Sequence, residues 1–178
     1  QRLSRGLGDV YKRQVYGQGT IGAEIVTQCD NLDAIIISVG GGGMISGVAG
    51  YLKSIWPNIE VIAASPKNHA VMIKSLEVGK IVKINPVPTI SDGTAGGVEE
   101  GSVTFEYCQR YVDHSILLSE EEIEKGIIQM IEKERVLVEG AAGTSIAALI
   151  KMREQLKGKR VGIIAVSYTH LRAHETIA

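Results

Sequence analysis

The chain has 178 residues, of which 44% are hydrophobic, and a formal net charge of −1 at pH 7. This length and apolar content are enough for the core of one ordinary domain. No apolar run reaches the roughly 18 residues of a membrane span, the N-terminus has no secretory signal, and no basic stripe offers nucleic acid an electrostatic footprint. We therefore expect a cytoplasmic protein with no membrane and no nucleic-acid partner.

The two cysteines, Cys29 and Cys108, lie far apart in the sequence. Their spacing is not that of a metal site, and two cysteines do not make a disulfide framework in a chain of this size. We expect both thiols to be reduced and to serve in packing.

The chain begins with a segment, residues 1–14, that is rich in arginine and lysine and has no apolar periodicity. It reads like translated sequencing-adapter text, so we expect a non-native tail, with a flexible native terminus as the alternative. The first predicted helix spans residues 21–29, where Ile21, Ile25 and Val26 share one side.

The most informative stretch is an apolar run that leads into four consecutive glycines. Residues 34–39 are rich in β-branched side chains and have no polar face, as in a parallel strand buried on both sides. Residues 40–43 remove every Cβ from the turn, so backbone N–H groups can converge on an anion at a helix N-terminus. We expect the anion to be a phosphate; the alternative is a tight turn that binds nothing.

Two well-known phosphate motifs do not match these glycines. A dinucleotide fingerprint that starts at Gly40 requires glycine where Ile45 stands. A P-loop that starts at Gly42 requires lysine where Val48 stands. The loop is therefore a strand–helix connection of another kind.

The residues after the glycines predict an amphipathic helix that ends at Trp56. Its apolar stripe consists of Met44, Val48, Leu52 and Ile55. We expect Gly47 and Gly50 to allow this helix to pack closely on the sheet, in preference to a role in ligand binding.

The remaining chain alternates further strands with helices. We expect strands at residues 61–64, 115–118 and 160–165, and helices at residues 70–78, 103–111, 120–135 and from 143 through 156. Ser119 and Glu122 form a capping box at the start of the third of these helices. This order predicts an α/β fold with a mostly parallel sheet flanked by helices.

Four separated motifs carry a resemblance to a known family. They are Gly17-Gln18-Gly19-Thr20-Ile21, the strand with its four glycines and Met44, Ser91-Asp92-Gly93, and Val138-Glu139-Gly140-Ala141-Ala142-Gly143. In this order and spacing the chain resembles the C-terminal half of the pyridoxal-phosphate-dependent serine/threonine dehydratases, which include threonine ammonia-lyase and serine racemase. The resemblance covers about residues 15–165. We therefore expect a cofactor-binding domain fragment at 15–165 between non-native tails at 1–14 and 166–178.

The resemblance implies the larger domain of the fold type II pyridoxal-phosphate enzymes, similar to tryptophan synthase β and here truncated. It also implies pyridoxal 5′-phosphate as cofactor. The cofactor-binding residues carried over are Gly40, Gly41, Gly42, Gly43, Met44, Gly93 and Glu139. Without the resemblance, the glycines at 91–97 are a flexible turn and Glu139 is a carboxylate that favours a helix dipole.

Two positions depart from the family pattern. In serine racemase and similar enzymes, a carboxylate after the second strand and another a few residues later hold a divalent cation, but here Ser65 and Val71 stand there. Because hard cations need oxygen ligands, preferably anionic, we expect no metal site of that kind.

The resemblance implies an ammonia-lyase that converts L-threonine or L-serine to a 2-oxo acid and ammonia, active as a homo-oligomer when complete. Serine racemase or a related dehydratase is the alternative within the family, and a non-catalytic phosphate-binding fragment is the alternative outside it. The family's cofactor-bonding lysine belongs to a segment upstream of Gly17 that this sequence does not contain. We therefore name no catalytic residue and expect the chain alone to be inactive.

Overall fold

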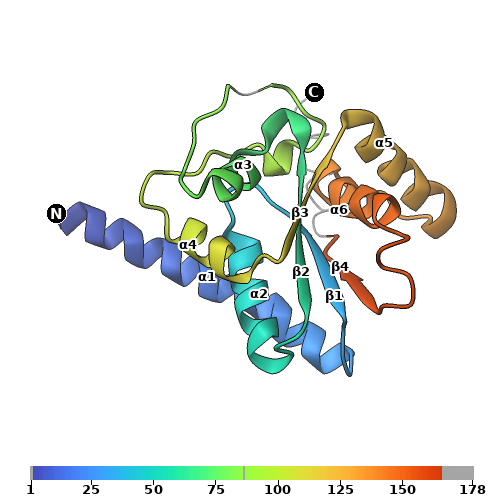
Figure 1. Ribbon diagram of the computed structural model, residues 1–178, viewed down its shortest axis with the longest axis horizontal. Coiled ribbons are helices and arrows are strands. Elements are labelled where there is room, and N and C mark those ends of the chain that lie inside the picture. The colour runs from blue at the N-terminus through green and yellow to red at the C-terminus, as the bar shows by residue number, and fades with distance from the viewer. Residues whose placement is uncertain (1, 86, 166–178) are drawn as a thin grey trace, which may run out of the picture.

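The centre of the structure is a sheet of four parallel strands (Figure 1). The structure is a computed structural model and describes residues 2–85 and 87–165. The strands are β1 (Ala34–Ser38), β2 (Glu60–Pro66), β3 (His114–Leu118) and β4 (Val161–Ile163), and they lie in the order β3-β2-β1-β4. The parallel α/β fold predicted from the sequence is confirmed.

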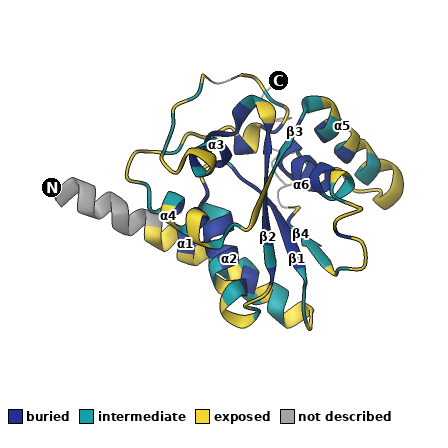
Figure 2. Ribbon diagram, viewed as in Figure 1, coloured by how far each residue is buried: buried dark blue, intermediate teal, exposed yellow. Residues whose placement is uncertain are grey.

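The inner strands β1 and β2 are shielded on both faces (Figure 2). Every residue of β1 is buried, and β1 pairs with β2 from Ala34 opposite Glu60 to Ser38 opposite Ala64. An unbroken apolar run suits such a strand because neither of its faces meets water. The edge strands β3 and β4 are only partly buried.

Helices cover the sheet on both sides. Within the described residues they are α1 (Arg2–Gln28), α2 (Gly43–Ile55), α3 (Val71–Val78), α4 (Val103–Tyr111), α5 (Glu120–Gln129) and α6 (Gly140–Lys151), with short 3₁₀ turns at Lys67–His69 and Asp92–Thr94. None of the helices in this part of the chain has the length and apolarity needed to cross a membrane.

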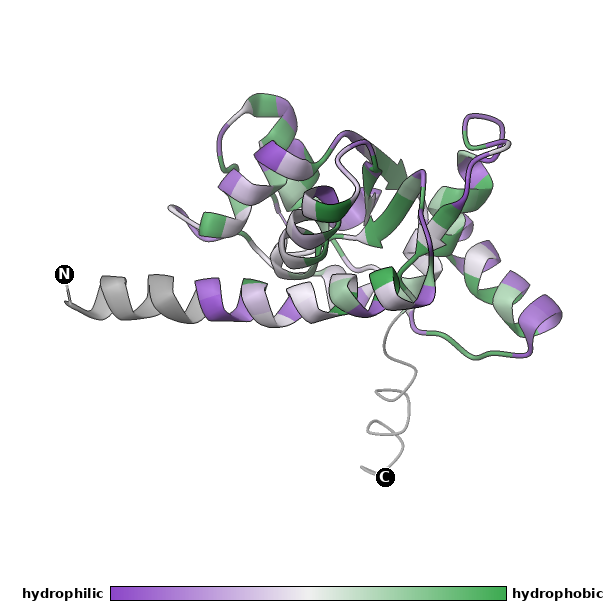
Figure 3. Cartoon of the chain, turned by 90° about the horizontal axis from the view of Figure 1, so that it is seen from below, coloured by the Kyte–Doolittle hydropathy of each residue, from purple (hydrophilic) through white to green (hydrophobic). Residues whose placement is uncertain are grey.

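Successive residues of β1 contribute to two separate cores. Ile35 and Ile37 pack in a cluster with residues of α1 to α4, including Val48. Ile36 packs in a second cluster with residues of α5 and α6, including Ile123. The apolar strands lie between these two layers of helices, as the hydropathy colouring in Figure 3 shows. The glycine-rich connection follows β1, an inner strand of the sheet with helices on both of its faces.

Helix α1 is much longer than predicted, since it begins at Arg2 and not at Ile21. Gly17 and Gly19, which precede the predicted start, lie in helical backbone, and α1 packs directly on α2. A Cβ added to Gly47 of α2 would collide with the carbonyl oxygen of Val15 and lie 2.7 Å from the nitrogen of Gly19. Gly47 does allow close packing, but against α1 and not against the sheet as predicted. The assignment of residues 1–14 to a non-native tail stays a prediction.

Two further helix ends differ from the predictions. The capping box at Ser119 and Glu122 is confirmed, but α5 ends at Gln129 and a wide π-helical turn, Met130–Glu134, replaces the expected last turns. Helix α6 ends at Lys151, short of the expected Leu156. The predicted helix α4 matches its observed bounds.

We predict that Gly47→Ala lowers the free energy of unfolding by about 1–3 kcal/mol, because the new methyl group meets backbone atoms of α1. Gly17→Ala is the matched control: Gly17 is also helical, but a Cβ there meets nothing within 4 Å. That change should be neutral or stabilising by about 0.5–1 kcal/mol. Urea unfolding of both variants checks the prediction, and equal stabilities would contradict the helix contact.

Candidate cofactor-binding site

The glycine loop, residues 40–43, lies at the carboxyl edge of the sheet, between β1 and α2. Strand β1 pairs with β2 on one side and with β4 on the other, and helices α2 and α6 lie on opposite faces. Ligands of open α/β sheets bind in the crevice at such a switch point. The position predicted for the loop is confirmed.

The four glycines fall into two classes. A Cβ on Gly40 would lie 2.8 Å from the carbonyl oxygen of Thr94, and one on Gly42 would lie 2.7 Å from the Met72 methyl carbon. Gly42 also has a φ of +84°, a conformation that other residues rarely adopt. These two glycines are therefore required by packing and backbone conformation.

A Cβ on Gly41 or Gly43 would make only ordinary contacts and no clash. The nearest atom to a Cβ on Gly41 is the carbonyl oxygen of Gly97 at 3.7 Å, and on Gly43 it is Gln14 Cδ at 3.9 Å. Gly97 and Gln14 line the same cavity as the loop. Gly41 and Gly43 therefore leave room for a ligand beside the loop.

The loop exposes the uncapped start of α2. The N-cap Gly42 has no side chain to cap the helix, and the first turn contains no acidic residue. The first N–H groups of an α-helix have no acceptor within the helix. In the described part of the chain, residues 41–44 donate no backbone hydrogen bond to another segment. These N–H groups and the helix dipole together favour an anion.

A cavity of about 400 Å³ lies in front of the loop. All seven residues carried over from the family line it, namely Gly40, Gly41, Gly42, Gly43, Met44, Gly93 and Glu139. The sequence analysis missed other lining residues, among them Gln14, Gln18, Thr94, Ser102 and Thr104. The last two come from the start of α4, and nothing in their local sequence distinguishes them from an ordinary helix start.

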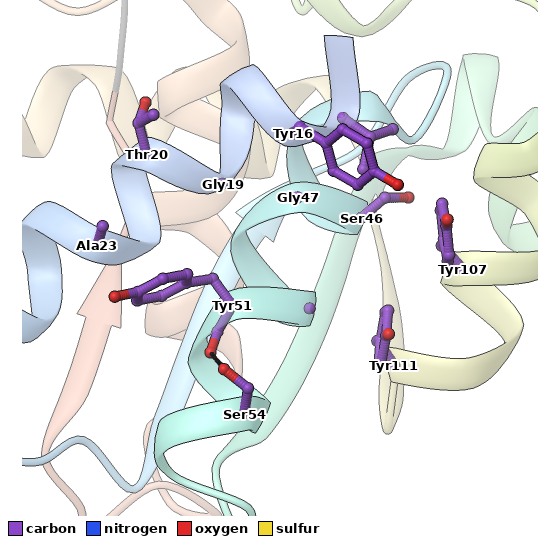
Figure 4. A pocket seen from close by; sticks show the side chains of 12 residues that line it. Tyr16, Gly19, Thr20, Ala23, Ser46, Gly47, Tyr51, Ser54, Tyr107 and Tyr111 are labelled. Carbon is purple, nitrogen blue, oxygen red and sulfur yellow. Dashed lines mark hydrogen bonds between the residues drawn. The ribbon is translucent and has the colours of Figure 1, made fainter. Parts of the chain in front are cut away.

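A second cavity, of about 450 Å³, lies between α1, α2 and α4 (Figure 4). Its wall includes four tyrosines, Tyr16 of α1, Tyr51 of α2, and Tyr107 and Tyr111 of α4, the last two with their rings stacked at a centroid distance of 6.1 Å. None of the residues carried over from the family lines it, and its described lining contains no charged side chain. The cavity at the glycine loop is therefore the candidate for an anionic cofactor.

The second glycine cluster is held in place by buried hydroxyl groups. The Ser91 hydroxyl lies 2.8 Å from that of Thr94 and accepts a hydrogen bond from Thr144 of α6 at 3.0 Å. Glu139 is the N-cap residue of α6, and its Oε1 lies 3.6 Å from a Cβ built on Gly93. The structure thus brings Gly93 and Glu139 together, and the N-cap position also fits the helix-dipole interpretation of Glu139.

Lys53 lies away from the cavity at the loop. It follows the start of α2 by about 15 Å along the helix, and its ammonium group donates to Asp113 Oδ2 at 2.8 Å and to the Ile59 carbonyl at 3.0 Å. No lysine of the described residues lines the cavity, whereas the carboxylates Glu99 and Glu139 do. The cavity therefore offers backbone donors to an anion and no amine.

The two positions at which the family resemblance led us to look for cation-binding carboxylates are occupied by buried residues, Ser65 and Val71. Ser65 is fully buried, and its hydroxyl donates to the Val39 carbonyl at 2.7 Å. Val71 is also buried, as the first residue of α3. Among the described residues, no group of three histidine, cysteine or acidic side chains could hold a metal ion.

The sequence matches known proteins along most of its length. The family model described as pyridoxal-phosphate-dependent enzyme matches residues 9–166. The chain is 38% identical over 150 residues to an L-threonine ammonia-lyase of Thermotoga maritima, covering 84% of this chain and 37% of that protein. It is 39% identical over 154 residues to a serine racemase of Dictyostelium discoideum, covering 84% of this chain and 47% of that protein. The chain thus spans less than half the length of these two relatives.

Solved structures give the same fold. The crystal structure of the Dictyostelium discoideum serine racemase matches with a TM-score of 0.78 at 37% identity, over 86% of this chain and 49% of that chain. The processed form of threonine deaminase isoform 2 from Solanum lycopersicum matches with a TM-score of 0.78 at 33% identity, over 89% of this chain and 48% of that chain.

The two cysteines, Cys29 and Cys108, lie in different environments. Cys108 is buried, as its predicted packing role requires, and its Sγ lies 4.0 Å from the Gly42 carbonyl oxygen. Cys29 is exposed, so its predicted packing role was wrong. Burial raises the pKa of the Cys108 thiol from 9.0 to about 11, although a hydrogen bond with Ser46 lowers it. Cys108 therefore stays protonated at neutral pH and remains able to donate.

This raised pKa predicts a loss of stability at high pH. The native state holds the Cys108 proton more tightly than the unfolded state, so the stabilisation is complete below about pH 9 and disappears as the pH rises to about 11. Two pH units correspond to roughly 3 kcal/mol at most. Between pH 9 and 11, the unfolding free energy from urea titrations should fall more steeply for the unmodified chain than for Cys108→Ala. Parallel curves would contradict the buried, protonated thiol.

Proposed function

The chain belongs to the pyridoxal-phosphate-dependent enzyme family, and we propose that it binds the phosphate of pyridoxal 5′-phosphate at the glycine loop. One observation carries this proposal: the uncapped start of α2 opens at the carboxyl edge of β1, into a cavity of about 400 Å³. This volume lies in the range of small-molecule sites.

The residues present fit a phosphate group. The N–H groups of residues 41–44 are available as donors, Gly41 and Gly43 leave room for phosphate oxygens, and no acidic residue lies in the first turn of α2. Hydrogen bonds to a charged group contribute roughly 1.5–3 kcal/mol each, before the cost of immobilising the ligand. We expect millimolar affinity for the chain alone.

The rest of the cofactor would lie along the same cavity. We propose that the backbone at Gly93 and the carboxylate of Glu139 lie beside its ring, because both residues line the cavity and lie next to each other. When bound, pyridoxal phosphate supplies an electron sink for removal of a proton from an amino-acid substrate. We assign no proton transfer to a residue of this chain.

For the complete protein we propose an ammonia-lyase that acts on L-threonine or L-serine. The supporting observation is the likeness to an L-threonine ammonia-lyase at 38% identity. Serine racemase is the second candidate, because the likeness to that enzyme is equally strong at 39% identity. We also propose, from the family resemblance, that the complete protein is a cytoplasmic homo-oligomer.

A calorimetric titration of the chain with pyridoxal phosphate tests the proposed site. Gly41→Val should weaken binding at least tenfold, because its side chain would occupy the free space beside the loop. Gly42→Val is a poorer test, because a Cβ there would clash with Met72 and Cys108 and would not enter the cavity. The clash would damage the fold and so obscure any direct effect on binding.

Gly17→Ala serves as the control, since Gly17 lies outside the cavity and has free space around it. It should bind the cofactor like the unmodified chain. If Gly41→Val also binds equally well, the glycines form only a turn and the proposal fails.

A further inference from the structure

Three carbonyl groups in and before the glycine loop are held by hydrogen bonds from other segments or from the next helical turn. The Ser65 hydroxyl of β2 donates to the Val39 carbonyl at 2.7 Å. The Thr104 hydroxyl of α4 donates to the Gly41 carbonyl at 2.7 Å. The Gly42 carbonyl accepts from the Ser46 N–H at 3.1 Å. The carbonyl oxygens of Val39 and Gly41 thus point toward β2 and α4, and that of Gly42 points along α2.

Each held carbonyl fixes the direction of the next N–H group. In a trans peptide the C=O and N–H bonds point in opposite directions, and the described chain contains no cis peptide bond. Holding the carbonyls of Val39, Gly41 and Gly42 therefore turns the N–H groups of Gly40, Gly42 and Gly43 the other way. Of these, Gly42 and Gly43 belong to the proposed phosphate donors. Glycines have the freest backbone of all residues, so these peptide planes would otherwise be poorly fixed.

Thr104 is well placed for this task. Its side chain is buried, and its hydroxyl group lies 2.8 Å from that of Ser102 as well as bonding to Gly41. A hydroxyl has one proton. Since Thr104 gives this proton to the Gly41 carbonyl, Ser102 must donate to Thr104. This chain of hydroxyl groups orients the Thr104 donor and connects α4 to the loop.

We propose that Thr104 is a positioning residue that presets the Gly42 N–H for phosphate, and that Ser65 assists by fixing the peptide plane at which the loop begins. This inference rests on the proposed function, because it concerns the same phosphate site. Neither hydroxyl needs to touch the ligand. Their effect is to lower the cost of ordering the loop when the anion binds, which is how preorganisation raises affinity.

The test uses the full chain and inorganic phosphate, with binding followed by NMR of the backbone amides. Thr104→Val keeps the shape of the side chain and removes the hydroxyl, and it should weaken phosphate binding about tenfold. Thr104→Ser restores the hydroxyl and should bind like the unmodified chain. Should Thr104→Val fail to fold, Thr104→Ala removes the same hydroxyl and takes its place.

A second pair of variants separates positioning from general stability. Ser65→Ala should weaken phosphate binding, whereas Ser75→Ala should not. Ser75 is an equally buried serine whose hydroxyl donates to a carbonyl, that of Val71, at the same 2.7 Å, but it does so within α3. Both changes should lower the unfolding temperature, so only the phosphate affinity distinguishes them.

The outcomes separate the two proposals. If the unmodified chain binds phosphate and Thr104→Val or its alanine substitute binds equally well, the positioning role is wrong and the phosphate site stands. If the unmodified chain does not bind phosphate, both proposals fail. Loss of binding in Thr104→Val with rescue in Thr104→Ser supports the positioning role.

Discussion

The conformation of Gly42 is the constraint on which the site depends. Its φ of +84° turns the chain sharply out of β1, so that α2 begins one residue later with an uncapped first turn. Met72 and Cys108 fill the space where a side chain at Gly42 would be. The same turn therefore packs against Met72 and Cys108 on one side and borders the cavity on the other. Packing fixes the backbone at Gly42, and the proposed phosphate donors follow directly from it in the chain.

Much of this arrangement could be predicted from local sequence. The apolar run of β1 predicts a strand buried on both faces, and four glycines before an amphipathic helix predict an anion site at its start. Gly93 and Glu139 followed only from the family resemblance, and the structure brings both to the same cavity. The start of helix α1 was mispredicted because residues 1–14 have no apolar periodicity and Gly17 and Gly19 lower helix propensity, whereas contact with α2 overrides propensity. Thr104 was missed because it meets the loop only in three dimensions, 63 residues after Gly41.

The fold does not determine which reaction the complete protein catalyses. The solved serine racemase and threonine deaminase structures share this fold, so the fold does not distinguish between the two activities. The choice between elimination and racemisation depends on groups that contact the substrate. What we propose for this chain is a backbone-lined site for an anion, held in place in part by buried hydroxyl groups.

A crystal structure of the chain soaked with pyridoxal phosphate tests the central claim most directly. The account predicts that phosphate oxygens lie within hydrogen-bond distance, about 2.7–3.2 Å, of the backbone nitrogens of residues 41–44. It also predicts that the Gly41 carbonyl stays bonded to Thr104. Phosphate bound elsewhere, or a Gly41 carbonyl turned into the cavity, would contradict the account.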